Sequence, residues 1–208
     1  DMDGDPVSLH RGDVGIRPYR SDNAPALAAA VQASLDDLRR WLPWAHEAYG
    51  TEDARSWIES RERAWGEGEA YSFAIVRTDG AAPEATNDAP AGDPTDEAWF
   101  LGGVGINRID RQNRVGNVGY WVRTSARGKG VATTATRLAA RFGFKQVGLR
   151  RLEFLVSIEN EASRRVAEKV GASREGVLRR RLRVREWVDD AFLYALLPDN
   201  FGDACWPE

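Results

Sequence analysis

Cysteine is almost absent from this 208-residue chain, and so are long apolar runs. Cys205 is the only cysteine, which excludes an intrachain disulfide and fits a reducing compartment. No apolar run approaches the roughly 20 residues that span a bilayer, and no basic segment followed by an apolar stretch opens the chain. We therefore expect a cytoplasmic protein without a signal peptide or a membrane contact.

A strong excess of charge of either sign is also missing. The chain has 29 Lys and Arg against 32 Asp and Glu, a formal net charge of −3. A general nucleic-acid-binding protein is expected to be strongly basic, so direct nucleic-acid binding is not expected. The length suits one substantial hydrophobic core, and we predict a single domain over residues 1–208.

One segment departs from this even composition. Residues 78–98 contain six acidic residues, three prolines and no Lys or Arg. Little of this segment can be buried, so we expect a flexible insertion within the domain. A solvated loop is the favoured interpretation, and an acidic attraction for a basic acceptor is the alternative.

A strand, a glycine-rich turn and a helix follow one another in the second half of the chain. Gly119–Val122 is apolar, Arg127–Ala132 reads Arg-Gly-Lys-Gly-Val-Ala, and apolar residues recur at helical spacing from Val131. Glycine lets the backbone approach a ligand, and the first N–H groups of a helix have no partner within it, so they attract an anion. The pattern predicts a phosphate site with Arg127 and Lys129 as adjacent cations.

A second strand and helix come next. The apolar strand 152–156 precedes Asn160, which is suited to cap a helix that stops at Gly171. The expected apolar stripe of this helix comprises Ala162, Val166 and Val170.

Hydrophobic periodicity and turn residues predict the remaining elements. A helix is expected over 24–38, and another from Thr51, as its N-cap, through Trp65. The other strands are expected over 14–17, 71–76, 99–109, 115–122, 176–184 and 191–197. Helices and strands mixed in this way indicate an α+β domain.

Four motifs in this order and spacing resemble the GNAT acetyltransferases. They are the Gly-Tyr-Trp-Val strand, the Arg-x-x-Gly-x-Ala turn, the next strand, and the Asn-x-x-Ser-x-x-Val-Ala-x-x-x-Gly-Ala helix. Within that family they resemble the RimJ/RimL-like branch of ribosomal-protein N-terminal acetyltransferases. The motifs cover roughly residues 99–197. The resemblance implies a mixed central sheet of about six to seven strands flanked by helices, with a splayed central strand that holds acetyl-CoA.

The resemblance also implies acetyl-CoA as the cosubstrate, with no metal. The backbone of the strand that ends at Trp121 and Val122 would face the pantetheine arm and the thioester. Asn160 would contact the pantetheine arm. The implied pyrophosphate-binding turn comprises Arg127, Gly128, Lys129, Gly130, Val131, Ala132 and Thr133.

Direct acetyl transfer to an amine needs an acid for the departing thiolate and a base for the amine. Ser163 lies near the sulfur by family analogy. Many GNAT enzymes carry a Tyr four residues later, where this chain has Ala167, so Ser163 is the candidate acid. The candidate bases are His46, Glu47, Glu186 and Asp189, and water is an alternative.

Trp41, Trp44, Trp57 and Trp65 could line an acceptor groove, although aromatic residues at such spacing usually belong to the core. Trp44 and Tyr120 are expected to line it, whereas Trp57 is expected in the core. Strand alternation would put Arg179, Arg181, Arg183 and Arg185 on one face. This stripe is interpreted as a solvated face, with ribosomal RNA, an acidic acceptor or the 3′-phosphate of CoA as alternative contacts.

The resemblance implies an N-acetyltransferase that transfers acetyl from acetyl-CoA to a primary amine. The expected acceptor is the N-terminal amine of a protein, in particular a ribosomal protein. One alternative is a small amine such as an antibiotic or a polyamine. The other is a non-catalytic acyl-CoA-binding module. Homodimers are common in this branch, so a homodimer is a further expectation.

Overall fold

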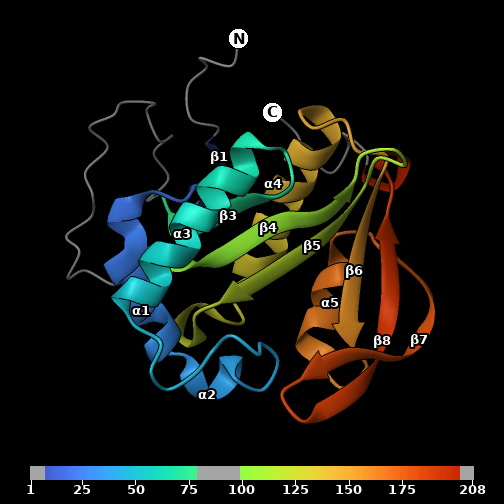
Figure 1. The fold of residues 1–208 in the computed structure, drawn as a ribbon. Helices are drawn as coiled ribbons and strands as arrows, with labels where there is room; N and C mark the ends of the chain where they lie inside the picture. Colours follow the sequence, from blue (N-terminus) through green and yellow to red (C-terminus); the bar gives the residue numbers. More distant parts are fainter. Residues whose placement is uncertain (1–7, 79–98, 202–208) are drawn as a thin grey trace.

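The computed structural model describes residues 8–78 and 99–201, which form one mixed sheet with helices on both faces (Figure 1). The strands are β1 (Leu9–Arg11), β2 (Val14–Pro18), β3 (Tyr71–Arg77), β4 (Phe100–Asp110), β5 (Val115–Val122), β6 (Arg151–Ser157), β7 (Ser173–Val184) and β8 (Trp187–Leu196). The helices are α1 (Ala24–Gln32), α2 (Leu35–Leu38), α3 (Thr51–Gly66), α4 (Val131–Lys145) and α5 (Glu161–Lys169). Short 3-10 turns cover Ser21–Asn23, Thr124–Ala126 and Pro198–Phe201. The insertion predicted over 78–98 falls outside the described residues apart from Thr78, as does Cys205.

The strands lie in the order β1-β2-β3-β4-β5-β6-β8-β7. Every neighbouring pair is antiparallel except β5 and β6, which are parallel. The predicted α+β class and mixed sheet are confirmed, but the sheet has eight strands rather than six to seven. The strand that the sequence did not indicate is β1, whose three residues are too few to show a periodicity of their own. Pairing with β2 makes it a strand.

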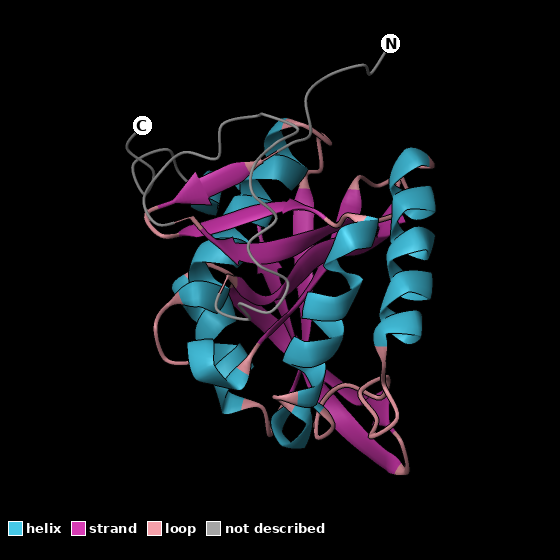
Figure 2. Ribbon diagram, turned by 90° about the vertical axis from the view of Figure 1, so that its left-hand side faces the viewer, coloured by secondary structure: helices cyan, strands magenta, loops and turns pink. Residues whose placement is uncertain are grey.

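The helices form two layers with the sheet between them. Helices α1 and α3 cover one face, and α4 and α5 cover the other (Figures 1 and 2). Strand β3 contributes side chains to the cores on both faces of the sheet, because successive side chains of a strand point to opposite faces. Phe73 and Ile75 belong to the core beneath α4, whereas Ala74 and Val76 belong to the core beneath α1 and α3.

The helix after the glycine-rich turn packs as its sequence pattern predicts. All five of its predicted apolar positions are buried: Val131, Ala135, Leu138, Ala139 and Phe142. Fully burying a Leu or Val side chain contributes about 1.5–3 kcal/mol, so this face holds α4 firmly on the sheet. The packing thereby fixes where the first turn of α4 lies.

Helix α5 begins and ends at the predicted residues. The side-chain oxygen of Asn160 accepts a hydrogen bond from the backbone N–H of Ser163 at 3.1 Å, as an N-cap does. Gly171 follows the helix with φ of +98°, the left-handed conformation that glycine adopts readily. The predicted apolar stripe is wrong at one position. Val170 is buried and Val166 is partly buried, but Ala162 is exposed because it faces the cleft described below.

The N-terminal helices differ from the prediction. The helix expected over 24–38 is divided into α1 and α2 around Ser34, which is buried and has φ of −121°. The Ser34 hydroxyl accepts a hydrogen bond from the backbone N–H of Thr124 at 3.0 Å, so a distant segment stabilises the break. Thr51 is not the N-cap of α3. Gly50 takes that position, and its N–H donates to the Asp53 carboxylate at 2.8 Å.

Candidate functional site

Strands β5 and β6 are paired over only three residues and then diverge (Figure 1). The parallel ladder joins 115–117 to 151–153, whereas 118–122 and 154–157 have no partner across the gap. Strand β5 stays paired with β4, and β6 stays paired with β8, so the unpaired backbone groups face the gap alone. The predicted splay is therefore present. Backbone N–H and C=O groups without a ladder partner are available there to a ligand.

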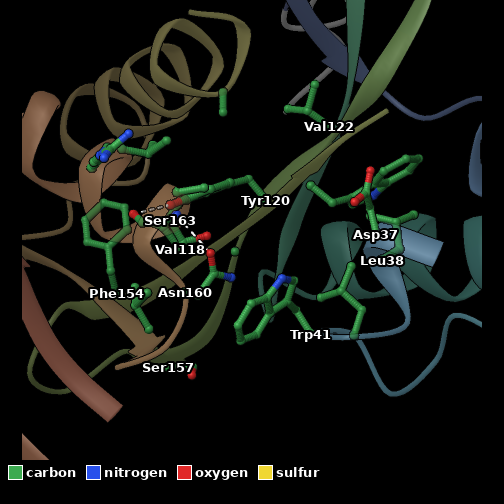
Figure 3. Close-up of a pocket in the computed structure, with 18 of the residues that line it drawn as sticks. Asp37, Leu38, Trp41, Val118, Tyr120, Val122, Phe154, Ser157, Asn160 and Ser163 are labelled. Carbon is green, nitrogen blue, oxygen red and sulfur yellow. Dashed lines mark hydrogen bonds between the residues drawn. The ribbon is translucent and has the colours of Figure 1, made fainter. Parts of the chain in front are cut away.

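A cavity of about 610 Å³ lies in this gap (Figure 3). The lining residues come from the glycine-rich turn, α5, α2, the segment 41–43 and the β7–β8 hairpin. We call this cavity the cleft. The predicted site residues that line it are Tyr120, Trp121, Val122, Arg127, Gly128, Gly130, Val131, Ala132, Thr133, Asn160, Ser163 and Asp189. The predicted residues that are not among those that line it are Trp44, His46, Glu47, Lys129 and Glu186.

The glycine-rich turn presents a helix N-terminus to the cleft. Gly128 and Gly130 have φ of +74° and +81°, and Gly130 is the N-cap of α4. A side chain at either position would meet no atom within 4 Å, so backbone conformation rather than space favours glycine there. The first N–H groups of α4 have no carbonyl partner within the helix. They form a candidate anion site next to the open edge of β5.

The two cations predicted beside this turn are engaged elsewhere. The Arg127 guanidinium forms an ion pair with Asp37 of α2 at 2.7 Å. The Lys129 amino group donates to the backbone oxygen of Ser125 at 3.1 Å, and Lys129 does not line the cleft. The anion site therefore consists mainly of backbone N–H groups, with Arg127 at its edge.

Asp37 connects α2 to the end of β5, a link that the sequence did not indicate. Its carboxylate also accepts a hydrogen bond from the Thr124 hydroxyl at 2.6 Å. The Thr124 hydrogen bond is the main reason that the pKa of Asp37 lies below its usual value, and the Arg127 guanidinium contributes as well. The carboxylate is thus ionised at neutral pH and holds α2 against the wall of the cleft.

Tyr120 crosses the splay from β5 to α5 (Figure 3). Its hydroxyl donates to the backbone oxygen of Ser163 at 3.0 Å. Burial raises the pKa of Tyr120 to about 12, so the phenol stays protonated at neutral pH. Ala167 is buried one turn further along α5 and offers no hydroxyl. Tyr120 and Ser163 together bring two hydroxyl groups to the first turn of α5.

A second polar pair lies where β6 ends. The hydroxyl of Ser157 donates to the Asp189 carboxylate at 2.6 Å and accepts from the Glu159 N–H at 3.2 Å. Both Ser157 and Asp189 line the cleft, and Ser157 is buried. Asp189 is therefore the one sequence-predicted base among the cleft-lining residues. Ser157 was not predicted, because a serine at a strand end carries no motif.

The predicted aromatic residues do not all take their expected positions. Trp41, rather than Trp44, lines the cleft (Figure 3). Trp44 is 40% exposed and packs edge-on against Trp121, with ring centroids 6.1 Å apart. Trp57 is 36% exposed rather than buried, and its ring stacks edge-to-face on Tyr19 at 4.8 Å. Trp57 lies on α3 and Trp44 in the segment between α2 and α3, and both rings are partly exposed at the surface.

The β7–β8 hairpin reaches the segment between α2 and α3. A guanidinium nitrogen of Arg185 donates to the backbone oxygen of Ala45 at 2.9 Å, across 140 positions of sequence. The predicted regular stripe of arginines is interrupted, because the register shifts between Leu178 and Leu182. Arg180 in this bulge has φ of +53°, and its N–H donates to Asp190 at 2.7 Å. Such bulges redirect side chains and are frequent beside active sites.

Within residues 8–78 and 99–201, no group of three or more His, Cys, Asp or Glu side chains is arranged to hold a metal ion. Over the same ranges, no helix has the length and apolarity needed to cross a membrane.

Comparison with known proteins identifies the family of the fold. The model of the acetyltransferase (GNAT) domain matches residues 13–173. YdaF of Bacillus subtilis (strain 168), whose name refers to ribosomal N-acetylation, is 33% identical over 98 residues, which cover 47% of this chain and 54% of that protein. The ribosomal-protein-serine acetyltransferase of Escherichia coli (strain K12) is 24% identical over 163 residues, 78% of this chain and 80% of that protein. The chain thus spans about half the length of the first curated relatives that it matches.

Solved structures agree with this result. Mycobacterium smegmatis RimJ in complex with CoA-disulfide has a TM-score of 0.79 and 25% identity, with coverage of 93% of this chain and 88% of RimJ. Microcin C7 self-immunity acetyltransferase MccE, in complex with acetyl-CoA and AMP, has a TM-score of 0.76 at 19% identity, with 90% and 93% coverage. The predicted fold is confirmed by these likenesses, and the two related structures contain CoA-disulfide and acetyl-CoA, respectively, the former in RimJ and the latter in MccE.

Proposed function

This chain belongs to the GNAT acetyltransferase family, and on that basis we propose that it transfers acetyl from acetyl-CoA to the N-terminal amine of a protein. The observation that carries the proposal is the splay between β5 and β6, where the N-terminus of α4 and the residues Tyr120 and Ser163 line one cleft. The pantetheine arm of CoA could lie in the cleft and form hydrogen bonds with the unpaired strand backbone, as an additional strand would. A ribosomal acceptor would locate the reaction in the cytoplasm, as the sequence analysis expects.

The proposed cosubstrate site follows the contacts already described. The pyrophosphate would accept hydrogen bonds from the N–H groups at the start of α4, at Val131, Ala132 and Thr133. The unpaired backbone of 118–122 would bind the pantetheine arm. Asn160 lines the cleft beside them, although its side-chain oxygen is already occupied by the cap, so its amide nitrogen is the group left for the arm.

In the proposed reaction the acceptor nitrogen attacks the thioester carbonyl carbon, so a C–N bond forms and the C–S bond breaks. Ser163 or Tyr120 would supply a proton to the departing sulfur, since both hydroxyl groups lie at the first turn of α5. The Asp189 carboxylate, held by Ser157, would accept the proton that leaves the amine. The other candidate bases from the sequence, His46, Glu47 and Glu186, are less suited because none of them is among the residues that line the cleft.

The charges of the cleft favour a protein acceptor over a polyamine. Its acidic lining residues are Asp37 and Asp189, and both carboxylates already accept hydrogen bonds from hydroxyl groups. Its basic lining residues are Arg108, Arg127, Arg165, Lys169 and Arg183. A polycationic substrate would be repelled from such a lining, whereas a peptide with a single free amine would not. The names of the relatives point to the same class of acceptor.

The test is thiol release from acetyl-CoA with three classes of amine: N-terminal peptides, polyamines and aminoglycosides. We expect turnover on peptides that begin with Ser or Ala and none on the small amines. Turnover on a small amine alone would replace the protein acceptor by that amine. Absence of CoA binding in calorimetry would refute the proposal altogether. The homodimer expected from the sequence stays a prediction, which analytical ultracentrifugation tests.

A further inference from the structure

The β7–β8 hairpin concentrates positive charge beside the cleft. Residues 179–190 contain five arginines and three carboxylates. Asp189 is hydrogen-bonded by Ser157, and Asp190 by the Arg180 backbone N–H. Within the part of the chain that the structure describes, none of the five arginines forms an ion pair with a carboxylate, and Arg179, Arg180 and Arg181 are all exposed.

Some of the arginines elsewhere in the described chain are paired with carboxylates. Six of them form ion pairs with Asp or Glu: Arg20, Arg39, Arg55, Arg127, Arg151 and Arg165. The three hairpin arginines also lie in a bulge that sets them against a single residue of β8, between the pairs Leu178–Ala191 and Leu182–Asp189. A regular strand would turn alternate side chains to opposite faces. The bulge instead leaves three consecutive guanidinium groups exposed.

This charge lies next to the path of an acceptor. Leu182, Arg183 and Val184, which directly follow the bulge, line the cleft, as does Asp189 opposite them. Arg185 at the turn of the hairpin holds it to the segment that follows α2. A chain that leaves the cleft along β7 would therefore meet the bulge after about three residues, or about 10 Å of extended backbone.

We propose that this surface, Arg179–Arg181 with Arg183, is a docking site for an acidic segment of the acceptor protein. The inference rests on the proposed function and narrows its substrate class to proteins that carry Asp or Glu at about the fourth to sixth residue. Guanidinium groups form paired hydrogen bonds with carboxylates, and charges at a rim raise the rate of encounter. An acidic protein segment fits better than RNA, because the net charge of −3 repels a long polyanion whereas a short acidic segment needs only the local surface.

The test is peptide binding to the CoA-loaded protein, measured by fluorescence anisotropy independently of turnover. Three octapeptides share a free Ser N-terminus and a C-terminal fluorophore, and carry Glu, Gln or Lys at positions 4–6. We expect the Glu peptide to bind about tenfold more tightly than the Gln peptide at 50 mM salt. The preference should vanish at 0.5 M salt, because exposed charges are then screened.

Variants test whether the preference for the Glu peptide depends on the arginines of the proposed docking site. Arg179→Gln/Arg181→Gln should remove the tenfold preference, whereas Arg179→Lys/Arg181→Lys should keep most of it. Arg63→Gln removes an exposed arginine from α3 and should leave the preference unchanged. None of these residues lines the cleft, so CoA binding should be the same in all of the variants.

The remaining outcomes overturn either the proposed docking site or only the proposed acetyltransferase function. Equal binding of the Glu and Gln peptides overturns the docking site, even if both peptides are acetylated. A ribosomal RNA hairpin that binds through the same arginines, without a preference for acidic peptides, makes the surface a nucleic-acid interface. A dimer that dissociates in the double Gln variant, again without that preference, makes it a contact between copies. A preference for the Glu peptide without acetylation of any peptide supports the docking site and refutes the proposed function.

Discussion

Two sets of contacts around the cleft differ greatly in range. The caps of the two motif helices are local: Gly130 caps the helix it precedes, and Asn160 accepts a hydrogen bond from the N–H of Ser163 three residues later. The contacts of α2 and of the β7–β8 hairpin are long-range: Ser34 bonds Thr124 across 90 positions, and Arg185 bonds Ala45 across 140. The caps are a property of short segments, whereas the long-range contacts exist only once the chain has folded.

This difference has a functional meaning in the proposed reaction. The cosubstrate has the same chemistry for every enzyme that uses it, so a local motif suffices to bind it. The acceptor differs from one enzyme to another, and loops and hairpins that meet in space can vary without disturbing the turn. The predictions below test whether the locally capped turn and the long-range contacts act separately, from the largest expected effect to the smallest.

Gly130→Asp should abolish CoA binding in calorimetry, a loss of more than about 100-fold. The substitution puts a carboxylate at an anion site and forces a non-glycine residue to adopt φ of +81°. Gly12→Asp is the matched control, because Gly12 also has positive φ and open space around it but lies in the β1–β2 turn. Normal CoA binding by Gly130→Asp would mean that the phosphates bind elsewhere.

Asp189→Asn should lower kcat by about 100-fold, the usual contribution of a general base, with little change in CoA binding. Asparagine can still accept the hydrogen bond from Ser157, so the variant should fold. Asp190→Asn changes the same charge at the adjacent position, which does not line the cleft, and should be nearly silent in steady-state kinetics. If the two variants behave alike, the base is another group or water.

Ser163→Ala and Tyr120→Phe should each lower kcat by about tenfold and leave the KM for acetyl-CoA within about threefold. Each removes one of the two hydroxyl groups at the first turn of α5. Since the pKa of Tyr120 is about 12, its loss should not shift a pH–rate profile measured between pH 6 and 10. A variant with unchanged kcat identifies a hydroxyl group that does not donate the proton.

Arg185→Ala should raise the KM for a peptide acceptor by about threefold to tenfold, without an effect on CoA binding. It removes the bond that holds the hairpin to the backbone of Ala45. Arg114→Ala is the control, because Arg114 also has positive φ and donates to a backbone oxygen, that of Gly148, away from the cleft. An equal effect of both variants on the peptide KM would show a general loss of structure.

Asp37→Asn should destabilise the fold by less than about 1 kcal/mol, because the carboxylate and its partner are exposed to solvent. The pKa of Asp37 is lowered in the folded protein, so its contribution is complete above the unfolded value of about 4 and is lost as pH falls through the folded value. Urea unfolding at pH 7 and pH 3 measures this, with Asp36→Asn as the neighbouring control. A difference between wild type and Asp37→Asn that persists undiminished at pH 3 would contradict it.

Residue patterns alone therefore indicated the family, the mixed sheet and the turn with its two motif helices. Periodicity and capping act over a few residues, so Asn160, Gly130 and the buried face of α4 could be recognised without a structure. The same reasoning wrongly predicted one helix where the structure has α1 and α2. The residues around Ser34 give no local indication of its hydrogen bond with Thr124. Trp41 and Trp44 likewise have similar sequence surroundings, and only packing decided which of them lines the cleft.

The sequence by itself determined the conformation of the glycine-rich turn and the caps of α4 and α5, because glycine conformation and helix caps depend on neighbouring residues. Only the tertiary structure decided that Arg127 turns to Asp37, that Tyr120 reaches Ser163, and that Asp189 rather than His46 faces the cleft. These contacts join segments far apart in the chain. Their geometry depends on how the sheet splays and how the hairpin returns, which no short stretch of sequence encodes.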